Sequence, residues 1–383
     1  NNFPSCFPSL GRMVLALVLA STIAWPADTA AKVTKVDGRE ALVLKSDVAE
    51  LVVDLAGGSI KDFHLLDQPL NPLQWDSADF DSTLARSDKK PRSMGHFLCL
   101  DRWGPASDAE IENGMGWHGE ASRVVWKVTR DGNEADGMIE AVMEAELPMA
   151  GLSVRRIIRM SQSTAVYKVR EEVTNTEPLG RIYNMVQHPT IGPPFLDETT
   201  VVDANAGRGF MQGGSLPNPE IPSVIWPGAL KPDGSAVNLR SFSDNTEPAV
   251  VSFVIDAEYG WATAANADKG LLIGYMWETD DYAWYDDWRN VRDGKPFARG
   301  LEFGTSGLHQ PFPVLVEKGK IFDRKIFVHI DAGETVARSY VNFLAPVGAD
   351  FTGVRDIVYD GGSLTLQSHT GGVIVVDAAA ISH

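Results

Sequence analysis

Residues 138–174 read MIEAVMEAELPMAGLSVRRIIRMSQSTAVYKVREEVT, and this stretch decides the fold class of the chain. It contains three β-rich runs, at 138–147, 152–160 and 165–174. Apolar and polar side chains alternate along much of these runs, a period that is typical of strands with one buried and one solvated face. The stretch therefore predicts neighbouring strands that pack on one side only.

Similar runs continue in both directions along the chain. They occupy 41–66, 123–129, 249–255, 270–277, 325–330 and 372–376, and the first of them breaks into two or three short strands. Helical periodicity is scarce, and no alternation of strands with helices indicates a parallel sheet. The spacing is typical of an antiparallel sandwich. We therefore expect one all-β domain over residues 32–383, with the Pro-, Gly-, Asn- and Asp-rich residues 189–248 forming long surface loops.

The composition is that of an acidic globular protein. Of 383 residues, 44% are hydrophobic and 22% are charged, and 34 basic against 51 acidic side chains give a net charge of −17. Such a surface repels phosphate backbones and anionic lipid headgroups, and no basic run offsets it. We therefore do not expect nucleic acid as a partner, whereas a neutral ligand such as a sugar is compatible with this charge.

The N-terminal segment has the pattern of an export signal. An apolar run over residues 13–25 follows Arg12; it is too short to cross a bilayer but has the length of a signal-peptide core. Small residues follow between 27 and 31. We expect residues 1–31 to be a signal peptide, the mature chain to lack a stable membrane span, and the protein to be periplasmic or secreted. A membrane anchor and a buried helix are the alternatives.

The cysteines and histidines predict neither a disulfide nor a metal site. Cys6 precedes the expected cleavage region, so the mature chain keeps only Cys99. Its neighbours Phe97, Leu98 and Leu100 predict a buried strand and an inert thiol. The eight histidines include no His-x-His or His-Glu-x-x-His pair, so no metal is indicated.

Three distant segments carry the functional signal. Residues 116–121 read GWHGEA, residues 184–189 read NMVQHP, and residues 300–305 read GLEFGT. In this order and spacing, with Trp126 shortly after the first, they resemble the galactose mutarotase (aldose 1-epimerase) family. The resemblance spans most of residues 38–340.

That resemblance implies a fold and a set of roles. The fold is a large antiparallel two-sheet supersandwich with a sugar bound in a cleft on one sheet. Glu302 is implied as general base, His188 as general acid, and His118 and Arg102 as substrate contacts, with no cofactor. Gln187 precedes His188 where simple mutarotases have asparagine, which places the chain nearer to the epimerase-like branches.

These residue types suit the opening of a sugar ring. One group must take the proton of the anomeric hydroxyl while another gives a proton to the ring oxygen, and the reverse step then closes the ring on the other face. A carboxylate such as Glu302 and an imidazolium such as His188 can do this without a metal, and positioned proton transfer contributes about 10²–10⁴-fold in rate. The forked donors of Arg102 can fix ring hydroxyls.

Residues 277–289, WETDDYAWYDDWR, interleave aromatic and acidic side chains. Trp284 and Trp288 can offer flat faces to the apolar side of a pyranose, while Asp286 and Asp287 accept from its hydroxyls. The two aspartates are also the candidates for the binding aspartate of the family. The alternative is an aromatic cluster that packs two strands, with the acidic residues outward.

The leading functional hypothesis is an isomerase that acts on a free monosaccharide or sugar derivative. A carbohydrate-binding protein without catalysis is the first alternative. A glycan-cleaving enzyme is the second, and it requires another carboxylate opposite Glu302, from Asp286, Asp287 or Asp101. The identity of the sugar and the oligomeric state stay open.

Overall fold

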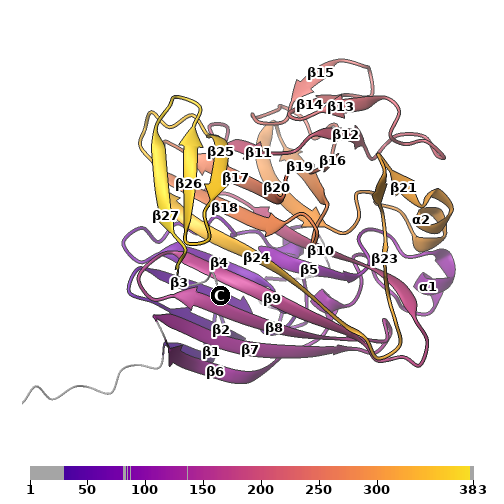
Figure 1. Cartoon of the computed structure of the whole chain (residues 1–383), viewed down its shortest axis with the longest axis horizontal. Helices are drawn as coiled ribbons and strands as arrows, with labels where there is room; N and C mark the ends of the chain where they lie inside the picture. Colours follow the sequence, from indigo (N-terminus) through magenta and orange to yellow (C-terminus); the bar gives the residue numbers. More distant parts are fainter. Residues whose placement is uncertain (1–29, 81–82, 84, 87, 136, 380–383) are drawn as a thin grey trace, which may run out of the picture.

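The computed structural model describes residues 30–379, apart from 81–82, 84, 87 and 136. Its strands pair antiparallel throughout and form two large sheets and three small ones (Figure 1). The predicted signal peptide lies outside the described residues except for Ala30 and Ala31, and Ala31 begins the first strand. In the part of the chain that the structure describes, no helix is long and apolar enough to span a bilayer. The predicted all-β antiparallel architecture is confirmed.

The larger sheet has twelve strands. In spatial order they are β1 (Ala31–Val36), β2 (Arg39–Lys45), β3 (Ala49–Asp54), β4 (Ile60–Leu65), β5 (His96–Asp101), β10 (Arg181–Ile191), β20 (Lys295–Gly304), β19 (Trp284–Arg292), β16 (Val250–Val254), β12 (Arg208–Met211) and β13 (Ser223–Ile225), with β23 (Val328–Ile330) beside one end of β10. Segments far apart in sequence thus meet at its centre, where β10 lies between β5 and β20.

The second sheet has eight strands. In spatial order they are β11 (Val201–Ala204), β17 (Tyr259–Asn266), β18 (Leu271–Glu278), β24 (Thr335–Pro346), β9 (Val166–Asn175), β8 (Leu152–Ser161), β7 (Met138–Leu147) and β6 (Lys127–Ala135). Along β8, buried residues alternate with half-buried ones over most of the strand, which is the one-sided packing that the sequence predicts.

The remaining elements are short. They are the pairs β14 (Gly228–Leu230) with β15 (Ala236–Asn238) and β21 (Lys320–Ile321) with β22 (Arg324–Lys325), the sheet β25 (Val354–Tyr359), β26 (Ser363–Ser368) and β27 (Val373–Asp377), the helices α1 (Asp108–Glu112) and α2 (Phe312–Lys318), and the 3₁₀ turns η1 (Ser77–Asp79) and η2 (Ala121–Arg123). The β25–β27 sheet, yellow in Figure 1, packs on the eight-stranded sheet, because Leu364 and Leu366 share an apolar cluster with Leu272 and Phe343.

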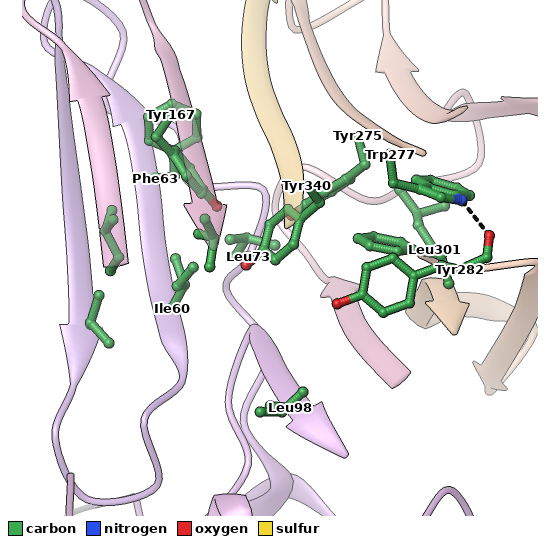
Figure 2. Packing of buried hydrophobic residues seen from close by; sticks show 14 of the residues in the cluster. Ile60, Phe63, Leu73, Leu98, Tyr167, Tyr275, Trp277, Tyr282, Leu301 and Tyr340 are labelled. Atoms are coloured by element: carbon green, nitrogen blue, oxygen red, sulfur yellow. Dashed lines mark hydrogen bonds between the residues drawn. The ribbon is translucent and has the colours of Figure 1, made fainter. Parts of the chain in front are cut away.

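Side chains from the facing sides of the two large sheets form the main core (Figure 2). Phe63 of β4 meets Tyr167 of β9 edge to face, with ring centroids 4.8 Å apart. Phe303 of β20 stacks on Trp277 of β18 with centroids 4.2 Å apart, and the indole N–H of Trp277 donates to the carbonyl of Tyr282. Burial of such large aromatic surfaces is the main force that holds the sheets together.

A buried polar network also joins the two sheets. Arg156 of β8 donates from Nε to Glu171 Oε1 of β9 at 2.6 Å, and it reaches the carbonyl of Gly58 next to β4. The other oxygen of Glu171 accepts from Gln187 Nε2 of β10, also at 2.6 Å, and Gln187 bonds His96 of β5 at 3.1 Å. Gln187, the residue before His188, therefore anchors the centre of the twelve-stranded sheet to the eight-stranded sheet.

Most of the predicted strands are confirmed, but three segments differ. The run at 325–330 is not one strand, because β22 ends at Lys325, residues 326–327 form a bend, and β23 begins at Val328. The runs at 138–147, 152–160 and 165–174 are β7, β8 and β9, and Cys99 is fully buried in β5. The strand predicted at 123–129 is wrong at its start, because Arg123 ends η2 and β6 begins only at Lys127. The expected loops at 189–248 contain five short strands, β11–β15. With three or four residues each, these strands are too short for alternation to reveal them.

The buried ion pair gives a direct test of how the sheets are held. We expect Arg156→Met to lower the free energy of unfolding by about 3–5 kcal/mol, because it leaves the Glu171 carboxylate buried without its cation. The matched control is Arg155→Met on the same strand, since Arg155 is 39% exposed and pairs with Glu172 at the surface; we expect a loss of about 1 kcal/mol or less. Urea denaturation measures both, and equal losses would contradict this account.

Candidate functional site

The register between β10 and β20 brings His188 and Glu302 together. The flanking pairs are Gln187↔Phe303 and Thr190↔Gly300, and no register shift separates them, so His188 lies opposite Glu302. Because side chains alternate between the faces of a sheet, Gln187 and Phe303 point into the core and the two site residues point to the outer face. Gly300 leaves room for the carboxyl group, since a Cβ there would lie 2.7 Å from Glu302 Oε1.

The two side chains are bonded to each other and are fixed by neighbours. His188 Nε2 lies 3.0 Å from Glu302 Oε1, and Glu302 Oε2 accepts from the indole N–H of Trp103 at 2.7 Å. On its other side, His188 Nδ1 bonds the hydroxyl of Thr190 at 2.9 Å, and the imidazole stacks on Phe97 with centroids 4.1 Å apart. Each group thus has a set orientation.

Burial controls the protonation of this pair. It raises the pKa of the Glu302 carboxyl well above its usual range, and the nearby Asp286 raises it further. It lowers the pKa of the His188 imidazole well below its usual range. Both directions favour neutral groups, so the proton of the Oε1–Nε2 hydrogen bond resides on Glu302.

His118 reaches the same place from a loop that is tied to β5. His118 has a φ of 63° and Gly119 a φ of 78°, and a Cβ on Gly119 would lie 2.3 Å from the carbonyl oxygen of Leu100. Only glycine permits this approach, which explains the His-Gly order in the sequence. The His118 ring lies 5.4 Å from that of His188, centroid to centroid.

The backbone sets the tautomer of His118. The Gly104 N–H donates to Nδ1 at 3.1 Å, so a neutral ring carries its proton on Nε2 and offers it as a donor. The indole N–H of Trp117 lies 2.8 Å from the same Nε2, and two donors cannot bond each other. Trp117 is 53% exposed, so it is the side chain that can turn to another acceptor.

These residues line a pocket of about 1000 Å³ on the outer face of the twelve-stranded sheet. Aromatic rings form much of its wall, and imidazoles with one carboxyl group form its floor. The lining comprises Trp75, Ser77, Phe80, Lys90, Pro91, Arg92, Ser93, Phe97, Trp103, Trp117, His118, Ser122, Arg123, His188, Val250, Trp288, Glu302 and His309. A concave site with apolar walls and a few convergent polar groups is typical of small-ligand binding.

His309 is a pocket residue that the sequence analysis missed. Its ring lies 4.6 Å from that of Trp103 and 5.6 Å from that of His118, and burial lowers its pKa to about 4. It follows β20 in a loop, where a lone histidine gives no periodic or motif signal. Among the described residues, no group of three or more His, Cys, Asp and Glu side chains is placed to hold a metal ion.

Four of the predicted site residues do not line the pocket. Arg102 is buried in ion pairs with Asp101 and Glu110. Trp284 packs in an apolar cluster with Leu308, and its indole N–H donates to a backbone carbonyl.

The two aspartates of the same segment differ from each other. Asp287 points to the core side, where it pairs with Arg299 at 2.7 Å. Asp286 shares the outer face with Glu302, its cross-strand partner, but it is fully buried beneath the pocket lining. Of this aromatic and acidic segment, only Trp288 lines the pocket, with its ring 5.7 Å from that of His188.

Three solved structures of similar fold are galactose mutarotase-like or mutarotase-related proteins. A galactose mutarotase related enzyme from Lactobacillus acidophilus aligns at 11% identity with a TM-score of 0.57, over 80% of this chain and 98% of its own. A galactose mutarotase-like protein from Clostridium acetobutylicum aligns at 11% identity with a TM-score of 0.58, over 84% and 99%. Another from Lactobacillus casei aligns at 12% identity with a TM-score of 0.54, over 80% and 100%.

These similarities establish the fold of the chain. It has the galactose mutarotase-like β-sandwich fold that the resemblance implies. No protein-family model matches the sequence, and a search of curated proteins finds no match.

The buried imidazoles predict a distinct NMR titration. Because burial lowers the pKa of His309 to about 4 and that of His96 to about 3, we expect both rings to stay neutral between about pH 5 and 8. The ¹⁵N chemical shifts of the ring nitrogens measure this, with His309→Gln to assign one set of signals. A His309 ring that titrates near the usual value of about 6.5 would show that the pocket is wetter than the structure indicates.

Proposed function

We propose that this protein is an isomerase that interconverts the anomers of a free sugar by acid–base opening of the ring. The observation that carries the proposal is the 3.0 Å contact between Glu302 Oε1 and His188 Nε2 on the floor of an aromatic pocket. The fold supports it, since similar structures include a galactose mutarotase related enzyme.

Ring opening needs one proton acceptor and one proton donor near the anomeric carbon. The Glu302–His188 pair holds one proton between two basic atoms, so it can accept a proton at one atom and deliver one from the other. The anomeric O–H bond and the bond from C1 to the ring oxygen break as the carbonyl forms. The ring oxygen gains the proton that the pair releases, and after rotation of the carbonyl the same steps run backwards.

The pair can adopt either assignment of roles. The family resemblance gives Glu302 as base and His188 as acid, which requires the shared proton on Nε2. Burial instead favours the proton on Glu302, with His188 as the acceptor. The two states differ by one proton shift along a 3.0 Å hydrogen bond, so both are available to the bound sugar.

The surrounding side chains suit the binding of a pyranose. His118 offers an Nε2 proton, and the Trp103 N–H stabilises a negative charge on Glu302. The rings of Phe97 and Trp288 flank His188 and provide flat apolar surfaces for the C–H face of a sugar. These groups position the ring and keep water from the reacting atoms.

Glycan cleavage, the second alternative, requires a second carboxyl group in the pocket, and the described lining provides none. Hydrolysis of a glycosidic bond needs two carboxyl groups that flank it. Of the residues that the structure describes, Glu302 alone contributes a carboxyl group to the pocket lining. Asp286 is buried beside it, Asp287 faces the core, and Asp101 is paired with Arg102 and Arg181.

Removal of the carboxylate tests the proposal. We expect Glu302→Gln to lower the rate of anomer exchange by about 10²–10⁴-fold, because the amide cannot take part in proton transfer. Exchange NMR on a panel of aldoses measures the rate, and Glu317→Gln, on the exposed side of α2, is the matched control. If no sugar is accelerated, or if the two variants are equally active, the protein only binds carbohydrate or acts otherwise.

The pH dependence of kcat/KM follows from the shared proton. Activity requires one proton on the pair, so we expect a bell-shaped profile. On the acid side activity is lost when His188 also becomes protonated, and because its pKa is lowered, this limb falls below about pH 6.5. On the alkaline side activity is lost when the pair gives up its proton, and the raised pKa of Glu302 moves that limb upward.

Rates of anomer exchange, measured at a series of pH values, give the profile. An acid limb at or above pH 6.5 that persists in His188→Asn would assign the titration to another group and overturn this interpretation of the pair.

A further inference from the structure

We propose that the sugar carries an anionic substituent, which Arg123 and Lys90 bind at one wall of the pocket. This inference rests on the proposed function and adds the class of substrate. The lining holds three cationic side chains, Lys90, Arg92 and Arg123, against one carboxyl group, that of Glu302, among the described residues. In a chain with a net charge of −17, this local excess of positive side chains is suited to an anionic ligand.

Arg123 is the central residue of this basic wall. Its side chain is exposed and makes no hydrogen bond or ion pair with any residue that the structure describes. The guanidinium packs against Gly116, where a Cβ would lie 2.0 Å from Arg123 Cζ. Burial is the main cause that lowers the pKa of the His118 imidazole, and the neighbouring His188, His309 and Arg123 lower it further. The free guanidinium is thus beside the loop that carries a substrate-facing histidine.

The other two cations differ in how far they are neutralised. Arg92 is buried and binds both carboxylate oxygens of Asp76, at 2.7 and 2.8 Å, so it supports the wall without a free charge. Lys90 is 76% exposed, and among the described residues its side chain forms one ion pair, a 3.9 Å contact with Asp88. A lysine so weakly held can turn to a ligand at little cost.

Hydroxyl groups complete the recognition surface. Ser77, Ser93 and Ser122 also line the pocket, and their side chains make no hydrogen bonds with described residues. Carboxylate, phosphate and sulfate oxygens all accept from guanidinium, ammonium and hydroxyl donors. The wall therefore suits an anionic oxygen group on a sugar.

The pocket also has room for such a substituent. A volume of about 1000 Å³ is at the upper end of the range for sites that hold drug-sized ligands. The anomeric end of the sugar would lie over Glu302 and His188, and the anionic end would lie at Arg123. With its two ends placed in this way, the sugar keeps its negative charge away from Glu302, and its ring is oriented over the Glu302–His188 pair.

Matched ligands test the inference on the full chain. Glucose, glucuronate and glucose 6-phosphate, and the galactose series alongside, are compared by saturation-transfer NMR and by calorimetry at low and high salt. We expect one anionic group to strengthen binding by about tenfold to a hundredfold over the neutral sugar. The carboxylate and phosphate arms then identify which group the wall prefers, and the preference should weaken with salt.

Variants locate the binding group. Arg123→Gln should remove most of the preference for the anionic sugar, and Arg123→Lys should keep part of it. Arg355→Gln removes the same charge from an exposed position on β25 and should keep all of it. Equal affinity for neutral and anionic sugars, or a preference that Arg123→Gln leaves intact, would overturn the inference.

The outcomes separate this inference from the proposed function. An anionic preference without anomer exchange on any sugar would sustain the binding wall and reject the isomerase. Rapid exchange of neutral sugars without an anionic preference would sustain the isomerase and reject the wall.

Discussion

The site depends on the antiparallel register of β10 and β20. His188 and Glu302 meet because the two strands pair without a shift between Gln187↔Phe303 and Thr190↔Gly300. A slip of one residue would exchange the faces of β20, so that the carboxyl group would enter the core and Phe303 the pocket. The close packing of Gly304 against Val186 limits such slips. A slip would bring a residue with a side chain to the place of Gly304, where even a Cβ would lie 2.4 Å from the side chain of Val186. The inter-sheet bond from Gln187 to Glu171 fixes β10 from the core side.

The same register explains the electrostatics of the pocket. It places a carboxyl group and an imidazole in an aromatic environment, away from water, where charge is disfavoured on both. The two side chains share one proton in a 3.0 Å hydrogen bond, while Trp103 and Thr190 bond their outer atoms. Arg123 and Lys90 line the same pocket from segments outside these two strands, where we propose that a charged substituent binds.

Alternation of side chains allowed much of the fold to be predicted, and short motifs gave part of the site. The strands from 138 to 174 were predictable because each buries one face over ten residues. His118, His188 and Glu302 were predictable from their local segments, and the structure brings them to one pocket. Asp287 could not be assigned, because the local pattern does not show which face of its strand packs against the other large sheet. His309 and Arg123 lie outside strands, where position follows from tertiary packing alone.

We propose that Glu302 and His188 act together on the anomeric centre of a sugar. A crystal structure of the chain with a saturating aldose tests it most directly. We expect electron density for a sugar in the pocket, with its anomeric hydroxyl and ring oxygen within hydrogen-bond distance, about 3 Å, of Glu302 and His188. A sugar bound at another surface, or one whose anomeric carbon points away from the pair, would contradict the claim.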